Sequence, residues 1–200
     1  MRALSFILLL VPLVLAGQAW AQAPEPVRVR GTVQSFDGHI LTVETKDGAS
    51  LALTLPDPPA VTGLEARSID DIGQNDFIGT TAVKADDGTW EALEVHIFPE
   101  SMRGAGEGHY AWDLPESTMT NAAVTGSAAS KDGRRLTLTY TGGSIDVEVT
   151  ADTRIVGFIP GSPDLLTPGA TVFVLAVPGP DGSAMAVAVV AETNGVAPPM

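Results

Sequence analysis

The sequence predicts an all-β protein made of two similar units in tandem. In residues 51–55 three leucines alternate with Ala52 and Thr54, and this period of two is typical of a half-buried strand. Such runs are separated by turns that need a positive φ, which Asp-Gly pairs supply at positions 37–38, 47–48, 87–88, 132–133 and 181–182. These features follow the same order in both halves of the chain.

The two halves keep a constant spacing between equivalent features. Gly31 and Gly126 lie in equivalent strands 95 residues apart, and Gly88 and Gly182 lie in equivalent turns 94 residues apart. A spacing that holds over a whole unit indicates a tandem duplication. We therefore expect two β domains, residues 27–100 and 120–193, joined by a structured connector over residues 101–119.

A short crossover helix is expected inside each unit. In the second unit Ser162 can cap a turn that starts at Pro163, and 167–169 (Thr-Pro-Gly) ends it. In the first unit residues 68–73 can form a similar single turn. Three strands, a short helix and two strands are the element order of a small five-stranded OB-like barrel. A plain β-sandwich of the same strands is the alternative.

The motifs of the second unit carry a family resemblance. They comprise Gly126, Asp132-Gly133, Asp152-Thr153-Arg154-Ile155 and Pro168-Gly169-Ala170. With these motifs, residues 126–190 resemble a family of exported bacterial domains of unknown function. The resemblance implies an OB-like barrel that often occurs in tandem, and it implies no activity. The first unit departs from the pattern at residues 56–59 (Pro-Asp-Pro-Pro).

The first 21 residues have the features of a secretory signal peptide. Arg2 precedes an apolar run over residues 4–16, and Ala19-Trp20-Ala21 places small residues before a cut at Gln22. The run is too short to cross a bilayer, which takes about 20 residues. We expect cleavage after Ala21, with Ala23 as a second possible site, and a mature protein in the bacterial periplasm or the medium that does not span the membrane.

Composition excludes several classes of function. The formal net charge is −13, with 11 Lys and Arg against 24 Asp and Glu, whereas nucleic-acid binding depends on basic residues that neutralise phosphates. The chain has no cysteine, which excludes disulfide scaffolds, thiol nucleophiles and cysteine zinc sites. No Gly-x-Ser-x-Gly turn is present for a serine nucleophile. The sequence therefore predicts no enzyme and no organic cofactor.

The connector is too rich in large side chains for a plain linker. His109 and Tyr110 are neighbours, and Trp112 and Leu114 follow closely, whereas flexible linkers are rich in Gly and Ser. We expect Trp112, Leu114 and Tyr110 to pack against one or both domains. The candidate binding residues are Arg103, Glu107, His109, Tyr110 and Trp112.

Metal binding is the second hypothesis for this region. His96, Glu107 and His109 lie close together in the sequence, with Met102 and Met119 nearby. Imidazole with carboxylate suits Zn, Ni or Cu(II), and thioether sulfur suits Cu(I). No spacing fixes a geometry, and His96 alternates with Val95 and Ile97, so that its side chain can also point to solvent.

Taken together, the sequence favours a non-catalytic exported module that binds or scaffolds in the cell envelope. Its partner would be a protein or a small ligand held by the connector and by the groove between the two domains, since clefts between domains commonly bind ligands. The alternative is a periplasmic metal-binding or metal-handling protein that uses His96 and His109. A hydrolase of unrecognised type is the third hypothesis.

Overall fold

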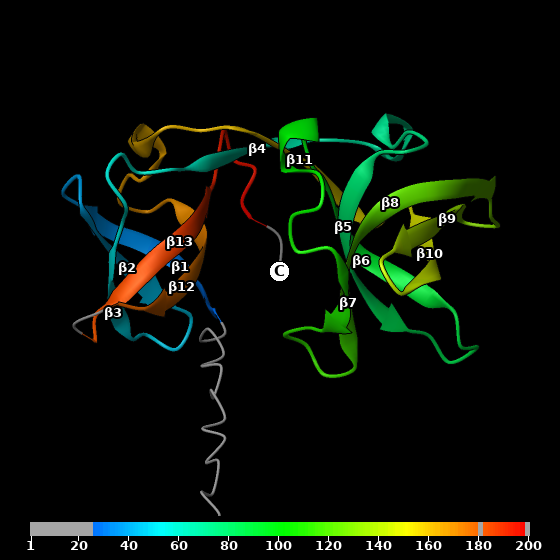
Figure 1. Cartoon of the computed structure of the whole chain (residues 1–200), viewed down its shortest axis with the longest axis horizontal. Coiled ribbons are helices and arrows are strands. Elements are labelled where there is room, and N and C mark those ends of the chain that lie inside the picture. Colours follow the sequence, from blue (N-terminus) through cyan, green and yellow to red (C-terminus); the bar gives the residue numbers. More distant parts are fainter. Residues whose placement is uncertain (1–25, 180–181, 199–200) are drawn as a thin grey trace, which may run out of the picture.

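The computed structural model describes residues 26–179 and 182–198, and strands make up most of this part of the chain (Figure 1). The prediction of an all-β fold is confirmed. The predicted signal peptide, residues 1–21, lies outside the described residues. Within those residues, no helix has the length and apolar character needed to cross a bilayer.

The described residues form strands and three short 3₁₀ helices. In chain order they are β1 (Val27–Phe36), β2 (Ile40–Thr45), β3 (Ser50–Thr54), β4 (Thr62–Ala66), η1 (Ile69–Asp71), β5 (Phe77–Lys84), β6 (Trp90–Ile97), η2 (Glu100–Met102), β7 (Gly108–Ala111), β8 (Ser117–Ala129), β9 (Gly133–Tyr140), β10 (Gly143–Thr150), β11 (Arg154–Pro160), η3 (Pro163–Leu165), β12 (Thr171–Pro178) and β13 (Ala184–Ala191).

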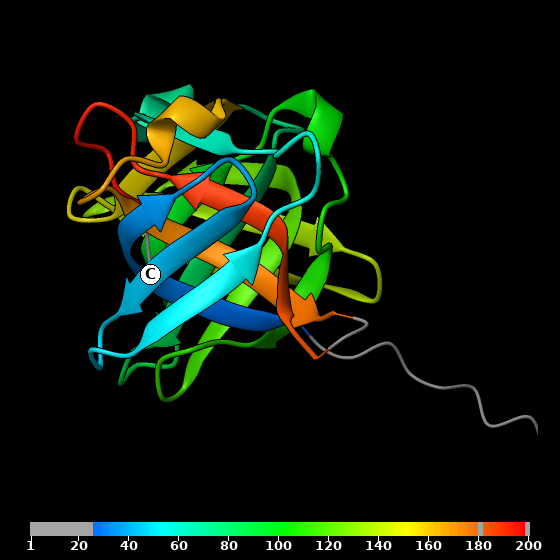
Figure 2. The ribbon, with the colours of Figure 1, turned by 90° about the vertical axis from the view of Figure 1, so that its left-hand side faces the viewer.

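Five strands from the two ends of the chain close into one barrel, which we name barrel A. Antiparallel pairing joins β1 to β2 and β2 to β3. β12 pairs with both β1 and β13, and β13 pairs in parallel with β3, so that the ring closes. Figure 2 shows β1, β2 and β3 lying next to the two late strands.

Five strands from the middle of the chain close into a second ring, barrel B. β5 pairs with β6 and β8, and β9 lies between β8 and β10. A short parallel pairing of β10 with β6 completes the ring. The two barrels lie side by side in Figure 1, with β4 and β11 passing between them.

Each barrel takes strands from both of the predicted units. Barrel A combines three strands of the range 27–100 with two of the range 120–193. Barrel B combines β5 and β6 of the first range with β8, β9 and β10, while β4 and β11 cross between the barrels. The predicted boundaries therefore do not separate the barrels. The physical reason is that β4 carries the chain out of barrel A after β3, and β11 carries it back before β12.

The crossing strands connect the barrels by hydrogen bonds as well as covalently. β4 and β11 pair antiparallel, with Leu64 opposite Phe158. β11 is parallel to β6 of barrel B, and β4 is parallel to β13 of barrel A. One continuous set of paired strands thus runs from barrel B to barrel A, which fixes the outer face of each barrel toward the other.

The two buried cores follow the barrels. The core of barrel A contains residues from the beginning and the end of the chain, among them Leu41, Leu53 and Val174, and the core of barrel B contains central residues such as Ile78 and Leu138. These five side chains are fully shielded from solvent. Because apolar burial is the main driving force of folding, each core requires both halves of the chain.

The predicted turns and crossover helices are largely confirmed. Gly38, Gly48, Gly88 and Gly182 have positive φ, as hairpin turns require. Gly133 differs, because it begins β9 and does not adopt a positive φ. Single 3₁₀ turns begin after Ser68 and Ser162, with Pro163 in the first turn of η3.

The connector has a fold of its own. η2 is followed by two turns and by β7, which pairs with the first half of β8. The predicted end of the connector, residue 119, lies inside β8, because this strand already begins at Ser117.

Candidate functional site

An apolar cavity of about 270 Å³ lies between the two barrels. Its lining comes from barrel A, barrel B, the connector and the end of the described chain: Arg30, His96, Phe98, Met102, Ala105, Gly106, Tyr110, Trp112, Met119, Asn121, Phe158, Phe173, Leu175, Ala188, Val190 and Pro198. Carboxylate side chains are absent from this lining. The cavity thus combines large apolar side chains with a few polar groups, which is typical of small-molecule sites.

Barrel A provides one wall through residues that point away from its own core. In β1 the buried Val29 and Val33 face inward, whereas Arg30 points outward. In β12 the core residues Val172 and Val174 likewise alternate with Phe173 and Leu175 of the cavity. The period of two of each strand therefore places one face in the core and the other in the cavity.

Barrel B and β11 provide the opposite wall. Met119 and Asn121 lie on the outer face of β8, His96 lies on β6, and Phe98 follows that strand. The ring of Phe158 from β11 packs edge-on against His96, with centroids 5.6 Å apart, and tilts against Phe98 at 5.0 Å. This wall is aromatic at its centre and polar at its border.

Aromatic residues are concentrated in this cavity. The chain has 11 Phe, Trp and Tyr residues, and nine remain without Phe6 and Trp20 of the predicted signal peptide. Five of these nine line the cavity: Phe98, Tyr110, Trp112, Phe158 and Phe173. Met102 and Met119 add thioether side chains, which adapt to irregular apolar ligands.

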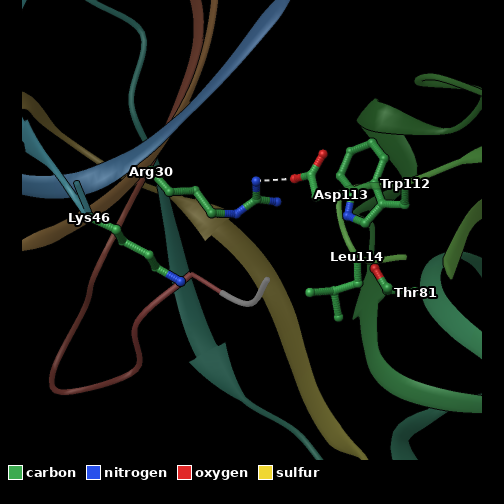
Figure 3. A pocket seen from close by; sticks show the side chains of 6 residues that line it. All are labelled: Arg30, Lys46, Thr81, Trp112, Asp113 and Leu114. Atoms are coloured by element: carbon green, nitrogen blue, oxygen red, sulfur yellow. Dashed lines mark hydrogen bonds and ion pairs between the residues drawn. The ribbon is translucent and has the colours of Figure 1, made fainter. Parts of the chain in front are cut away.

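The connector closes the cavity by docking onto barrel A. Asp113 accepts hydrogen bonds from both Arg28 and Arg30, and the Arg28 guanidinium lies 3.9 Å from the ring centroid of Trp112. Figure 3 shows Arg30 extended from β1 toward Asp113. A cation over an aromatic face is attracted by the ring quadrupole, so this cluster holds Trp112 at the edge of the cavity.

A second, smaller cavity adjoins the first. It measures about 130 Å³ and is lined by Arg30, Lys46, Thr81, Trp112, Asp113 and Leu114 (Figure 3). Arg30 and Trp112 line both cavities. The apolar cavity is therefore bordered by a smaller space whose lining includes two cationic side chains and one carboxylate.

Asn121 holds the connector loop from the cavity wall. Its Nδ2 donates to the carbonyl oxygens of Ala105 at 3.3 Å and Gly106 at 3.2 Å, and to the Tyr110 hydroxyl at 3.4 Å. The residue is only 8% exposed, and its Oδ1 has no hydrogen-bond partner within the described part of the chain. A side chain on Gly79 would approach this oxygen to 2.5 Å, so that only glycine leaves room for it.

His96 belongs to a buried polar row. Its Nε2 lies 3.0 Å from Glu94 Oε1, which also accepts a hydrogen bond from Thr81 Oγ1 at 3.0 Å. Because a carboxylate only accepts hydrogen bonds, the proton of this bond lies on His96 Nε2. The His96 side chain is 12% exposed, so it faces the cavity and not bulk solvent.

The candidate binding residues of the connector divide into two groups. Tyr110 and Trp112 line the cavity, and burial raises the pKa of the Tyr110 phenol, although the charge of Arg28 opposes this rise. Arg103, Glu107 and His109 lie elsewhere and hold the connector in place. Since Arg103 binds Glu100 and the Asn75 carbonyl, it ties η2 to the loop before β5.

Glu107 and His109 face barrel B instead of the cavity. Glu107 accepts hydrogen bonds from the Thr141 side chain and backbone, and these hold the pKa of its carboxyl below the ordinary value. His109 Nδ1 lies 2.8 Å from Thr120 Oγ1, and its ring stacks on Tyr140. These contacts with barrel B explain why the connector contains Glu107 and His109: both side chains pack it against that barrel.

The predicted metal ligands do not come together. His96 bonds to Glu94 on β6, His109 packs on Tyr140, and Glu107 binds Thr141. Three strand pairings, from β7 through β8 and β5, separate the strands of the two histidines. Among residues 26–179 and 182–198 no group of three His, Asp or Glu side chains could hold a metal ion, so a site for Zn, Cu or Ni built on these residues is not supported.

Several cavity residues are not predicted by the sequence analysis. Arg30, Asn121, Phe158 and Phe173 come from strands of different predicted units. A signal is present in β1, where Arg28 and Arg30 alternate with valines in an acidic chain. No family model, curated protein sequence or solved structure matches this chain, so the site is interpreted from its geometry alone.

Proposed function

We propose that this protein is a non-catalytic binding module that takes a small, mainly apolar ligand into the cavity between its barrels. The observation that carries the proposal is the concentration of five aromatic and two methionine side chains on walls supplied by both barrels and the connector. A cavity between two domains is a common place for a ligand. Burial of apolar surface would supply most of the binding free energy.

The size of the cavity limits the ligand. At the share of liquid volume that water occupies, about 270 Å³ corresponds to roughly nine water molecules. A compact ring compound or a short alkyl chain matches this space, whereas a peptide strand or a polysaccharide does not. A scaffolding role, in which the connector contacts a protein partner, is the broader form of the same proposal.

The chemistry of the walls supports a binding role in preference to catalysis. His96 is the imidazole of the cavity lining, and its Nε2 is used by Glu94. Within the described lining no serine stands beside it as a nucleophile, and nucleophilic catalysis requires such a pair within hydrogen-bond reach. The polar groups of this wall hold the structure together.

The proposal also includes export of the protein and a tandem duplication of its unit. The charged start, apolar run and small residues of the first 21 positions support export and cleavage after Ala21, into the periplasm or the medium. The order of three strands, crossing strand, 3₁₀ turn and two strands occurs twice. This order supports a tandem duplication of an OB-like unit, as in the exported family that residues 126–190 resemble, with the closing strands exchanged between the copies.

Methionine methyl groups provide a direct test. Met102 and Met119 line the cavity, whereas Met185 lies on β13 and is not part of the lining. We would label the mature protein with ¹³C-methyl methionine and titrate it with 3-phenylpropanamide, a neutral compound of the right size. Met102→Leu, Met119→Leu and Met185→Leu would assign these three of the four methionine signals of the mature chain.

The expected result is a saturable shift of the Met102 and Met119 signals, with that of Met185 unchanged. The shift should disappear when Ala188→Trp fills the cavity from the barrel A wall. Absence of any shift for this compound and for its carboxylate analogue would overturn the proposal. Equal shifts of all three signals would place binding elsewhere and would also contradict it.

A further inference from the structure

We infer that the ligand is an amphipathic carboxylate, whose apolar body occupies the cavity between the barrels and whose carboxylate binds Arg30. This inference rests on the proposed function and adds the chemical class of the ligand. It is carried by three features of Arg30: its position, the hydrogen bonds it makes, and the charges around it.

Arg30 lies where the larger and the smaller cavity meet. It lines both of them, together with Trp112. Its guanidinium carbon lies 4.6 Å from the ring centroid of Phe173 and 5.9 Å from that of Trp112. Aromatic neighbours contact the faces of a guanidinium and leave its edges for hydrogen bonds, so the group is held in position with its donors directed sideways.

Arg30 retains donors that the protein does not use. Nη1 donates to Asp113. Nε is buried and has no hydrogen-bond partner within residues 26–179 and 182–198, and no hydrogen bond from Nη2 is formed within that same part of the chain. Nε and Nη2 form one edge of the guanidinium, and such an edge matches the two oxygens of a carboxylate in a bidentate pair.

The charge around Arg30 also favours an anion. Arg28 and Arg30 share the single carboxylate of Asp113, so this cluster keeps one positive charge. Asp113 is the one carboxylate in the lining of either cavity within the described residues, although the whole chain has a net charge of −13.

The buried Nε–H of Arg30 indicates that the head group of the ligand is a hydrogen-bond acceptor. A buried N–H without a partner is unfavourable, because it loses its hydrogen bonds with water. A ligand carboxylate would satisfy it and add a charge-assisted bond. A neutral apolar ligand would leave it unpaired, and a cationic head group would meet the positive charge of the cluster.

A matched pair of probes tests the inference. 3-Phenylpropanoate and 3-phenylpropanamide share the same apolar body and differ in the charge of the head group. We would measure both dissociation constants at 0.15 M salt from the Met102 and Met119 methyl shifts. The carboxylate should bind about tenfold to hundredfold more tightly than the amide, the range that a charge-assisted hydrogen bond supplies.

Variants of the two arginines locate the effect. Arg30→Gln should remove the preference for the carboxylate, so that the ratio of the two dissociation constants falls to near one, and Arg30→Lys should retain only part of the preference. Arg28→Gln is the matched control, because Arg28 also bonds Asp113 but does not line either cavity. Arg28→Gln should lower the preference less than Arg30→Gln, because it removes the excess charge of the cluster but keeps the Nε–Nη2 edge of Arg30.

Each outcome has one meaning. Equal affinity of the two probes for the unaltered protein would overturn the inference, and so would an equal loss of the carboxylate preference in Arg28→Gln and Arg30→Gln. In both cases binding of the amide would still support the proposed function. Failure of both probes to shift the methyl signals would overturn the proposed function itself. Thermal melts of all variants would show that they are folded, and if Arg30→Gln does not fold, Arg30→Lys decides.

Discussion

The two barrels have similar cores but different outer walls toward the cavity. Barrel A presents apolar side chains there, including Phe173, Leu175 and Val190. Barrel B carries buried polar residues on β5, β6 and β8, namely Thr80, Thr81, Glu94, Ser117, Thr120 and Asn121, and among the described residues the strands of barrel A have none. The wall of barrel A is thus mainly apolar, with Arg30 as its charged group, whereas barrel B carries a set of buried, hydrogen-bonded polar groups.

This difference has a physical cause. Buried polar groups must find hydrogen-bond partners, which restricts their positions far more than apolar packing does. In barrel B the Thr81–Glu94–His96 row and the Nδ2 group of Asn121 meet that requirement, whereas Asn121 Oδ1 has no partner among the described residues. We therefore expect the barrel B wall to be rigid and sensitive to substitution, and the barrel A wall to tolerate apolar replacements.

The largest effect is expected from the two cores, where the barrels should behave alike. Leu41→Ala in barrel A and Leu138→Ala in barrel B each remove a fully buried side chain, which costs about 2–5 kcal/mol. Because β4 and β11 connect the barrels by hydrogen bonds, both variants should lower a single urea transition. Two separate transitions, only one of them shifted, would show that the barrels fold independently.

The polar row of barrel B should give the next largest effect. Glu94→Ala leaves the Thr81 hydroxyl and His96 Nε2 without their acceptor, at a cost of about 1–3 kcal/mol for each buried group left unpaired. The neighbouring Leu93→Ala is the control, since Leu93 is 41% exposed. Urea denaturation of both variants measures the difference, and equal losses would contradict the role assigned to the row.

Gly79 tests the close approach of β5 and β8. Gly79→Ala places a methyl group 2.5 Å from Asn121 Oδ1, and overpacking of this kind costs about 1–3 kcal/mol. The double variant with Asn121→Ala should recover part of the loss, because the clashing atom is removed. Purely additive losses in this double-mutant cycle would exclude the contact.

The docking of the connector onto barrel A should contribute less. Asp113→Asn weakens both ion pairs with Arg28 and Arg30, and partly exposed pairs contribute about 0–1 kcal/mol each. The loss of stability should shrink as salt is raised, because these charges are screened. A loss that is independent of salt would assign the role of Asp113 to packing.

The smallest effect concerns pH and the connector's contact with barrel B. The Thr141 hydrogen bonds lower the pKa of Glu107 from 4.5, so its stabilising contribution is present above that value and is lost as the pH falls through the folded-state pKa. Glu107→Gln should therefore melt below the unaltered protein at pH 7 and approach it toward pH 3. A difference in melting temperature between the two proteins that does not change with pH would contradict this assignment.

The sequence predicts local structure much better than the pairing of distant strands. Period-two runs and Asp-Gly turns identify β2, β3 and β10 because these features depend on neighbouring residues. The exchange of the closing strands leaves every local pattern unchanged. β5 and β12 are equivalent strands of the two units and have similar apolar patterns, so that either of them suits the edge of β1. The pattern of either unit is therefore equally compatible with closure within one copy or between copies.

The candidate site shows the same limit. Tyr110 and Trp112 are correctly placed at the cavity, because aromatic side chains in a connector require a surface to pack on. Glu107 and His109 are polar residues in the same segment, and only the position of β9 decides that they bind barrel B. Arg30 and Phe173 meet only through the pairing of β1 with β12, which no spacing in the sequence reveals.

Engineered cysteines test the exchange most directly, since the chain has none of its own. Thr32 lies opposite Thr171 in the β1–β12 pairing, and directly opposed residues of antiparallel strands are about 4.5–5.5 Å apart, within reach of a disulfide. At the spacing of 94 residues that relates Gly88 to Gly182, the equivalent of Thr171 is Phe77, which would oppose Thr32 if each barrel came from one unit. We predict rapid oxidation of Thr32→Cys/Thr171→Cys to an intramolecular disulfide and none in Thr32→Cys/Phe77→Cys; the reverse result would contradict the exchanged barrels and the cavity that lies between them.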